Sequence, residues 1–239
     1  MQDAIRDIVG PLLDDAERVL GSGFAAVLYG SGARGEYLPG VSDINLLLVG
    51  DSLRPETLRR LSGALQGLRH QRQAPPLLIE RGEWDRAADV FPIEITDMRL
   101  AHEVLRGADP LTGLRVDSAD LRSALEREFH SKLLRLRQVY AVHATDPRAL
   151  GEVSARTIST VAALFRAALA LHGREVPTAT PACLTAAGAA MGIATAPLLE
   201  LWGSRGKPDT VCPPERFEGY LLAVTTAVRV IDQFTSGGN

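Results

Sequence analysis

The sequence predicts an α+β protein in which strands and helices share the first half and helices alone fill the second. Short apolar runs bounded by turn residues, which are typical of buried strands, occur only in the first half. Apolar residues at helical spacing continue through the second half without any strand pattern. A segment with Pro and Gly, residues 108–117, separates the two patterns. We therefore expect two domains, over residues 1–112 and 113–239.

The first domain is expected to contain three helices and four strands. Its opening helix has a continuous apolar stripe, its second has Pro55 near the N-terminus, and its third is closed by Gly107. The expected helices are 2–20, 54–71 and 100–107, and the expected strands are 24–30, 44–50, 75–80 and 90–98.

The second domain is expected to be a bundle of five helices. Short loops join the helical segments, so neighbouring helices pack antiparallel. The expected helices are 117–144, 147–173, 181–192, 196–204 and 214–234. An alanine-rich stretch between Val161 and Ala190 allows close helix approach, which fits packing within the bundle or a homodimer face equally well.

Composition excludes several classes of protein. Hydrophobic residues make up 46% and charged residues 23% of the 239-residue chain, which is ordinary for a soluble globular protein. We expect no membrane association, because no apolar run reaches about 18 residues. The net charge of −3 disfavours a general nucleic-acid binder. Cys183 and Cys212 form neither a disulfide framework nor a metal cluster, and the first residues do not resemble a signal peptide, so we expect a cytoplasmic protein.

Residues 29–50, "YGSGARGEYLPGVSDINLLLVG", contain two overlapping motifs. The glycines Gly30, Gly32 and Gly35 match the G-x-G-x-x-G turn that binds dinucleotides. That turn must open a crossover, which needs about 10–12 residues or more. Only "EYLPGVSD" lies before the next strand, and its Pro-Gly pair marks a turn, so a crossover helix does not fit.

The second motif fits the same segment. Gly30 and Ser31 end a strand, where small residues let a phosphate approach the backbone N–H groups. Asp43 and Asn45 alternate with apolar residues at the start of the next strand and therefore project from one face. Two oxygen ligands on one rigid strand suit an Mg²⁺ ion bound to the phosphates of a nucleotide.

The segment "LYGSGARGEYLPGVSDINLLLV" resembles the minimal nucleotidyltransferase signature of the DNA polymerase β superfamily. A domain of this kind followed by a helical bundle is similar to the aminoglycoside nucleotidyltransferases. The later segments "DVFPIEITDMRLAHEVLRGADPL" and "KLLRLRQVY" resemble a group of bacterial nucleotidyltransferase-domain proteins of unknown substrate. The resemblance implies a mixed sheet flanked by helices. It also implies Mg²⁺-dependent transfer of a nucleoside monophosphate, AMP from ATP, to a hydroxyl or similar acceptor.

The resemblance assigns roles to individual residues. Gly30 and Ser31 match the pair that contacts phosphate, and Asp43 matches the first metal-binding aspartate. Asn45 stands where the family has its second aspartate, so it departs from the pattern. The family takes a third carboxylate from a later strand, for which the sequence offers Glu94 and Asp97.

Of these two acids we prefer Glu94 as the third catalytic and metal-binding residue. On a strand over residues 90–98, Glu94 faces away from the apolar Ile93 and Ile95, whereas Asp97 shares their face near the strand's end.

Two basic side chains are candidates for binding the phosphates of the nucleotide. Arg34 follows the Gly-Ser turn and is expected to contact a phosphate. Lys132 lies beside the apolar stripe of the first bundle helix with Arg135 and Arg137, although such a run of charges is more often a solvated face.

Asn45 removes one negative charge from the expected two-ion site. Because Mg²⁺ relies on carboxylates, we expect weak occupancy of the ion that activates the acceptor, while the nucleotide's phosphates still bring the other. Nucleotide binding therefore survives this change better than chemistry. Two hypotheses follow: an active nucleotidyltransferase, or a weakened member that binds nucleotide or a partner protein in a regulatory role. The acceptor stays open.

Overall fold

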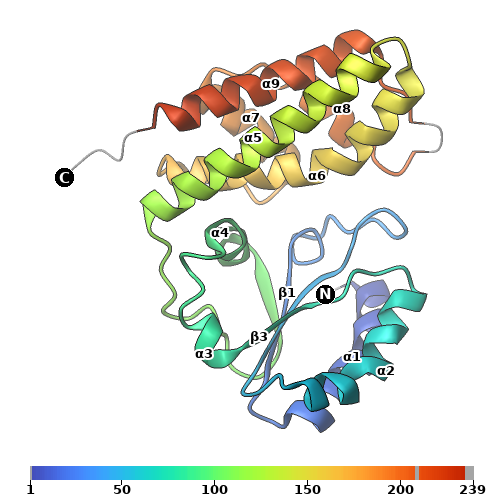
Figure 1. Ribbon diagram of the computed structural model, residues 1–239, viewed down its shortest axis with the longest axis vertical. Helices are drawn as coiled ribbons and strands as arrows, with labels where there is room; N and C mark the ends of the chain where they lie inside the picture. Colours follow the sequence, from blue (N-terminus) through green and yellow to red (C-terminus); the bar gives the residue numbers. More distant parts are fainter. Residues whose placement is uncertain (1, 208–209, 235–239) are drawn as a thin grey trace. The chain divides into compact units, whose positions relative to one another are not determined.

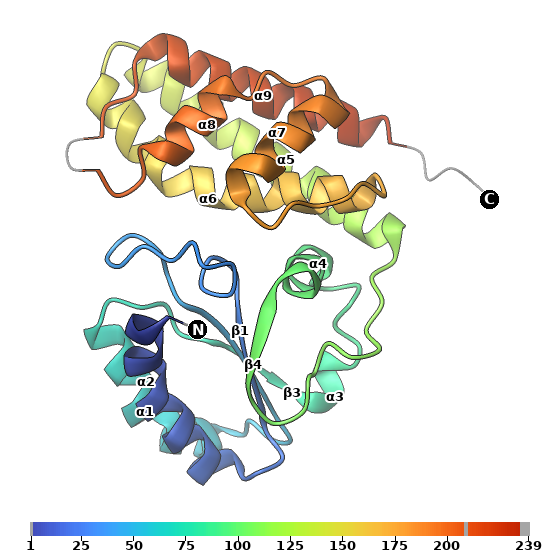
Figure 2. The same ribbon diagram turned by 180° about the vertical axis from the view of Figure 1, so that it is seen from behind.

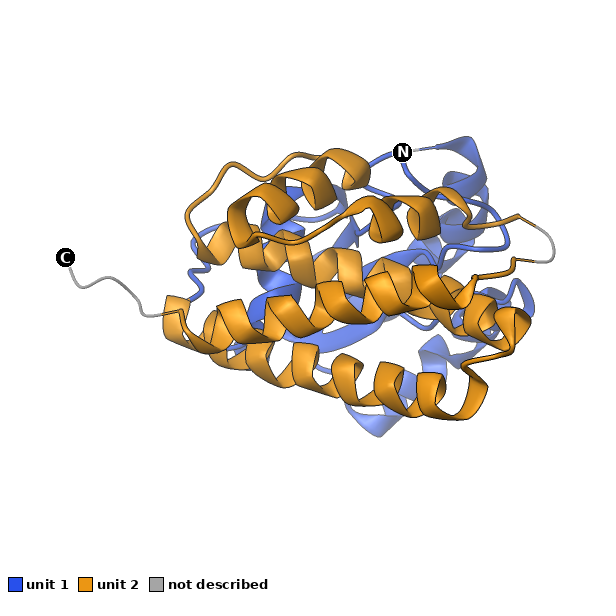
Figure 3. Cartoon of the chain, turned by 90° about the horizontal axis from the view of Figure 1, so that it is seen from above, with its two compact units in different colours: residues 1–116 blue, residues 117–239 orange. Residues whose placement is uncertain are grey.

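The computed structural model describes residues 2–207 and 210–234 and divides the chain into two compact units, Met1–Val116 and Asp117–Asn239. Figure 3 draws these units in two colours. The boundary expected from the sequence lies after residue 112, four residues earlier. The first unit combines a sheet with helices and the second is helical in all its described elements (Figure 1), which confirms the predicted α+β class.

The first unit is built on a four-stranded mixed sheet. Its strands are β1 (Ala25–Tyr29), β2 (Asn45–Gly50), β3 (Leu77–Glu80) and β4 (His102–Arg106). Their order is β3-β2-β1-β4, with β1 antiparallel to both β2 and β4, and β2 parallel to β3. The C-terminal end of β1 and the N-terminal ends of β2 and β3 therefore lie at the same end of the sheet.

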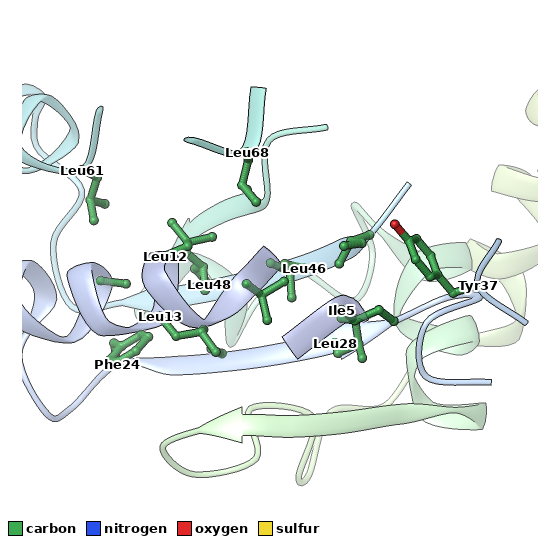
Figure 4. Packing of buried hydrophobic residues seen from close by; sticks show 14 residues of the cluster. Ile5, Leu12, Leu13, Phe24, Leu28, Tyr37, Leu46, Leu48, Leu61 and Leu68 are labelled. Atoms are coloured by element: carbon green, nitrogen blue, oxygen red, sulfur yellow. The ribbon is translucent and has the colours of Figure 1, made fainter. Parts of the chain in front are cut away.

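Two helices cover one face of this sheet. The apolar stripes of α1 (Asp3–Leu20) and α2 (Pro55–His70) enclose the even-numbered residues of β1 and β2 in one buried cluster. Figure 4 shows Leu12 and Leu13 of α1 beside the strands, and it labels Leu61 and Leu68 of α2, which belong to the same cluster. Removing this much apolar surface from water fixes the helices against the sheet.

Two short helices cover the opposite face (Figure 2). They are α3 (Arg81–Trp84) and α4 (Pro92–Leu100). Trp84, Ile95 and Met98 pack there against the odd-numbered residues of β1 and β2. The indole N–H of Trp84 donates to the Pro110 carbonyl oxygen at 2.8 Å, so its polar atom is satisfied within the core.

Two predicted elements have the wrong type of secondary structure. Residues 92–98 of the expected strand 90–98 belong to α4, and residues 100–107, expected as a helix, contain β4. Pro92 at the first helical position suits a helix start, because its missing N–H has no helical partner there. The β4 segment pairs with the free edge of β1, and this long-range pairing outweighs its local helical pattern.

The second unit contains the five predicted helices. They are α5 (Ser118–His143), α6 (Pro147–Leu171), α7 (Thr180–Met191), α8 (Ala196–Gly203) and α9 (Pro214–Asp232). The Asp117 carboxylate caps α5 by accepting from the Ala119 N–H at 2.7 Å. Among the described helices, α6 alone is long and apolar enough to cross a membrane, and 56% of that stretch is buried, as in a core helix.

Candidate functional site

A tight turn follows β1 and places backbone N–H groups at the end of the sheet where β1 ends and β2 starts. Gly30 has a φ of +70°, and the carbonyl oxygens of Gly30 and Ser31 accept from the N–H groups of Arg34 at 3.2 Å and Glu36 at 2.9 Å. Within the described chain, the N–H groups of residues 31–33 donate no hydrogen bond. Free N–H groups at the start of such a turn suit an anionic oxygen.

Asn45 lies next to this turn at the start of the antiparallel strand β2, and Asp43 lies two residues before it. Asn45 is the first residue of β2 and is paired with Tyr29, the last residue of β1. A Cβ atom on Gly30 would collide with the Asn45 side-chain amide, so the turn and the strand are in direct contact. Asp43 is exposed and makes no hydrogen bond or ion pair with any described residue. Ile44 between them is buried, as the alternation predicts.

The start of β2 is held by a residue that the sequence analysis does not identify. The Gln73 side-chain oxygen, in the loop after α2, accepts from the backbone N–H of Ile44 at 2.8 Å. Tyr29 is also missed, although it is the last residue before the Gly-Ser pair. Both residues fix the backbone that carries Asp43 and Asn45.

The two candidate third acids both lie on α4. Glu94 is exposed in its first turn, and Asp97 is buried one turn later. Burial, followed by the negative charges of Glu94 and then Asp97, raises the pKa of Tyr29 to about 12, so both carboxylates are near this phenol. The expected strand geometry of Glu94 is wrong, but the structure brings both acids to the end of β1.

Arg34 is engaged within the protein. Its side chain is only 7% exposed, and its Nη1 lies 3.2 and 3.1 Å from the two carboxylate oxygens of Asp97. Its Nε lies 3.9 Å from Glu36 Oε2 and makes no hydrogen bond. The guanidinium expected to contact a phosphate is therefore committed to Asp97 in this structure.

Lys132 lies on α5, in the second unit. Its Nζ is 3.6 Å from Glu128 Oε2, one helical turn away. A pair of this kind on a helix surface contributes only a few tenths of a kcal/mol, so the lysine is available to another anion. Its contact with a nucleotide stays a prediction.

The residues at this end of the sheet do not complete a two-ion metal centre. The β2–β3 ladder begins with Leu47 beside Leu77, so Asn45 has no partner residue in β3. No carboxylate is thus offered from β3 on that face. Among the described residues, no group of three or more His, Cys, Asp or Glu side chains could hold a metal. The Asp43 carboxylate and the Asn45 carbonyl oxygen suit at most one ion that arrives with a nucleotide.

Part of the chain matches a known protein family, and its fold is similar to a solved structure. Residues 13–102 match the family described as Nucleotidyltransferase domain. No curated protein sequence matches the chain. The fold is similar to the crystal structure of spectinomycin adenyltransferase AAD(9) from Enterococcus faecialis, with a TM-score of 0.59 and 13% identity over 95% of this chain and 99% of that one. That protein was crystallised with ATP and spectinomycin, and at this identity the likeness establishes the fold. Residues 13–102 therefore match the nucleotidyltransferase domain family, and the fold of the chain is similar to that of an adenyltransferase.

Proposed function

We propose that the chain binds ATP at the turn after β1 and transfers its AMP group to an acceptor of unassigned identity. One observation carries this proposal: the unpaired N–H groups of residues 31–33 lie beside Asn45, two residues from the exposed carboxylate of Asp43. Hydrogen-bond donors for a phosphate and a ligand for a phosphate-bound cation are thus adjacent. The nucleotidyltransferase match over residues 13–102 supports the same chemistry.

Each residue has a defined role in the proposal. The N–H groups after Gly30 and Ser31 bind phosphate oxygens, and Asp43 with the Asn45 carbonyl oxygen holds one Mg²⁺ brought by the triphosphate. When bound, this ion neutralises charge on the phosphates. Glu94, the exposed carboxylate near Tyr29, accepts the acceptor's proton.

The reaction is an in-line displacement at the α-phosphorus. A bond forms between the acceptor oxygen and this phosphorus, and the bond from the α-phosphorus to the bridging oxygen breaks. Pyrophosphate leaves with that electron pair, while the proton of the acceptor goes to Glu94.

A second function is favoured by a specific feature, the lack of a carboxylate at position 45. A site with one carboxylate binds the nucleotide but activates an acceptor poorly. In this alternative the chain binds nucleotide for regulation and does not turn it over.

Thermal unfolding of the full chain with each nucleoside triphosphate tests the binding step. We expect ATP with Mg²⁺ to raise the midpoint, because a ligand at about 100 times its Kd stabilises by about 2.7 kcal/mol. Asp43→Asn should remove the Mg²⁺-dependent part of this gain. Asp51→Asn is the matched control, since Asp51 is an exposed acid just beyond the other end of β2. Absence of stabilisation by every nucleotide would refute the proposed site.

Release of pyrophosphate from ATP separates transfer from binding. The wild type and Asn45→Asp are compared with a panel of hydroxyl acceptors, including aminocyclitols, nucleosides and proteins. Turnover that increases in Asn45→Asp supports the transferase. If ATP binds and neither protein releases pyrophosphate with any acceptor, the binding-only alternative holds.

A further inference from the structure

A buried ion pair joins the turn after β1 to α4. Arg34 lies in the turn and Asp97 on the helix, 63 residues apart in the sequence. Their side chains are 7% and 11% exposed, so solvent screens their attraction only weakly. Removing either partner would take from the other buried charge its contact at 3.1 Å, which is unfavourable.

Each partner is attached to a rigid element. Asp97 lies between Ile95 and Met98, both fully buried against the sheet, so its carboxylate has a fixed position. The backbone N–H of Arg34 donates to the carbonyl oxygen of Gly30 at 3.2 Å and closes the turn. The ion pair therefore fixes the turn relative to the sheet.

The same helix carries Glu94 three residues before Asp97, which is about one helical turn. The contact between Arg34 and Asp97 thus links the turn that carries the free N–H groups to the helix that carries Glu94. Preorganised donors of this kind cost no reorganisation when a phosphate binds.

We infer that Arg34 is a positioning residue that does not bind phosphate: Asp97 holds its guanidinium, and together they fix the phosphate-binding turn relative to Glu94. This inference rests on the proposed function for its ligand. It replaces the direct phosphate contact that the sequence suggests for Arg34.

Asp97→Asn distinguishes the two roles by the sign of its effect. If Arg34 only positions the turn, losing the ion pair loosens the turn, and ATP binds about tenfold more weakly. If Arg34 is a phosphate ligand, the substitution frees it and removes a negative charge near a polyanion, so ATP binds more tightly. Isothermal titration with ATP and Mg²⁺, at a temperature where each variant is folded, measures the difference.

Further variants complete the test. Arg34→Met should weaken ATP binding as much as Asp97→Asn does, and the double variant should be no worse than either single one. Arg34→Lys keeps the charge and should restore part of the affinity. Tighter binding, or unchanged binding, in Asp97→Asn would overturn the inference.

Arg106 provides a matched control at the opposite end of β1. Like Arg34 it contacts two carboxylates, with Nη2 3.2 Å from Asp14 Oδ1 and Nε 3.6 Å from Glu17 Oε2. Arg106→Met and Asp14→Asn should leave ATP affinity unchanged. A loss of affinity in these controls equal to that in Asp97→Asn would show a general effect of stability and would refute the specific role.

Hydrogen exchange without nucleotide separates this inference from the proposed function. In Asp97→Asn the amides of Arg34 and Glu36, which close the turn, should exchange about tenfold faster, while those of α1 stay unchanged. If the wild type does not bind ATP, the proposed function fails, and this measurement alone decides the positioning role. Unchanged exchange in the turn would refute it.

Discussion

Substitution of Gly30 by alanine tests the contact between the turn and β2. Gly30 has a φ of +70°, in the left-handed region, and its missing side chain leaves room for the Asn45 amide. Gly35, five residues later in the same turn, has a φ of +73° but nothing within 4 Å of an added Cβ. The two glycines therefore share the positive φ and differ in the collision with Asn45.

The expected magnitudes follow from this difference. A non-glycine residue in the left-handed region costs about 1–2 kcal/mol, so both Gly30→Ala and Gly35→Ala should destabilise by that amount. At about 4 °C per kcal/mol, the unfolding midpoint should fall by about 4–8 °C in each. Only Gly30→Ala must also turn the Asn45 amide away. Losing a contact between this amide and a charged group costs about 1.5–3 kcal/mol, which is roughly a 10- to 100-fold loss of affinity for ATP with Mg²⁺.

Titration calorimetry with ATP and Mg²⁺, together with thermal unfolding, checks both parts. Asn45→Ala should lower affinity as Gly30→Ala does, and the double variant should show no further loss, because the same contact is removed. If Gly35→Ala lowers ATP affinity as much as Gly30→Ala, the contact with Asn45 is irrelevant to binding and the reasoning fails.

Three further substitutions have defined outcomes. Burial lowers the pKa of His172 below 6.5, so the unfolded chain binds this proton more readily than the folded chain. The contribution of His172 to stability is therefore fully present above pH 6.5 and is lost as the pH falls below it. In His172→Gln the unfolding midpoints at pH 7.5 and 5.5 should lie closer together. Trp84→Phe leaves the Pro110 carbonyl oxygen without its donor and should cost about 1–3 kcal/mol in urea unfolding. Tyr220→Phe removes a hydrogen bond of 3.0 Å to Thr157 and should cost about 1 kcal/mol by the same measurement; no loss would contradict a buried bond.

The interior of the sheet is predictable from sequence and its edge is not. Strands β1 and β2 are buried on both faces, so each is a nearly continuous apolar run. Strand β4 lies at an edge and none of its residues is fully buried, so its polar residues give no alternation to recognise. In α4, which has nine residues, the order Ile93, Glu94, Ile95 imitates a strand. Pro92 at its first position is the signal that favours a helix.

Local patterns identify part of the candidate site for a physical reason. Alternation of polar and apolar residues predicts that Asp43 and Asn45 share a face, and the structure has Ile44 buried between them. Contacts between distant segments leave no such pattern. The pairing of Arg34 with Asp97 depends on how α4 packs on the sheet, which neither segment encodes alone.

Because Asn45 is uncharged, ATP binding should depend less on a metal ion than it would with an aspartate at this position. A second aspartate would repel the triphosphate in the absence of a cation: a unit charge about 6 Å from a phosphate contributes about 0.7 kcal/mol in bulk water and about 3 kcal/mol at an effective dielectric of 20. With asparagine this repulsion is absent, so ATP should bind measurably in EDTA. Asn45→Asp should increase the ratio of the Kd in EDTA to that in Mg²⁺ by between about threefold and a hundredfold. Asp51→Asn, at the far end of β2, should leave the ratio unchanged. An equal ratio in the wild type and Asn45→Asp would show that position 45 does not face the phosphates.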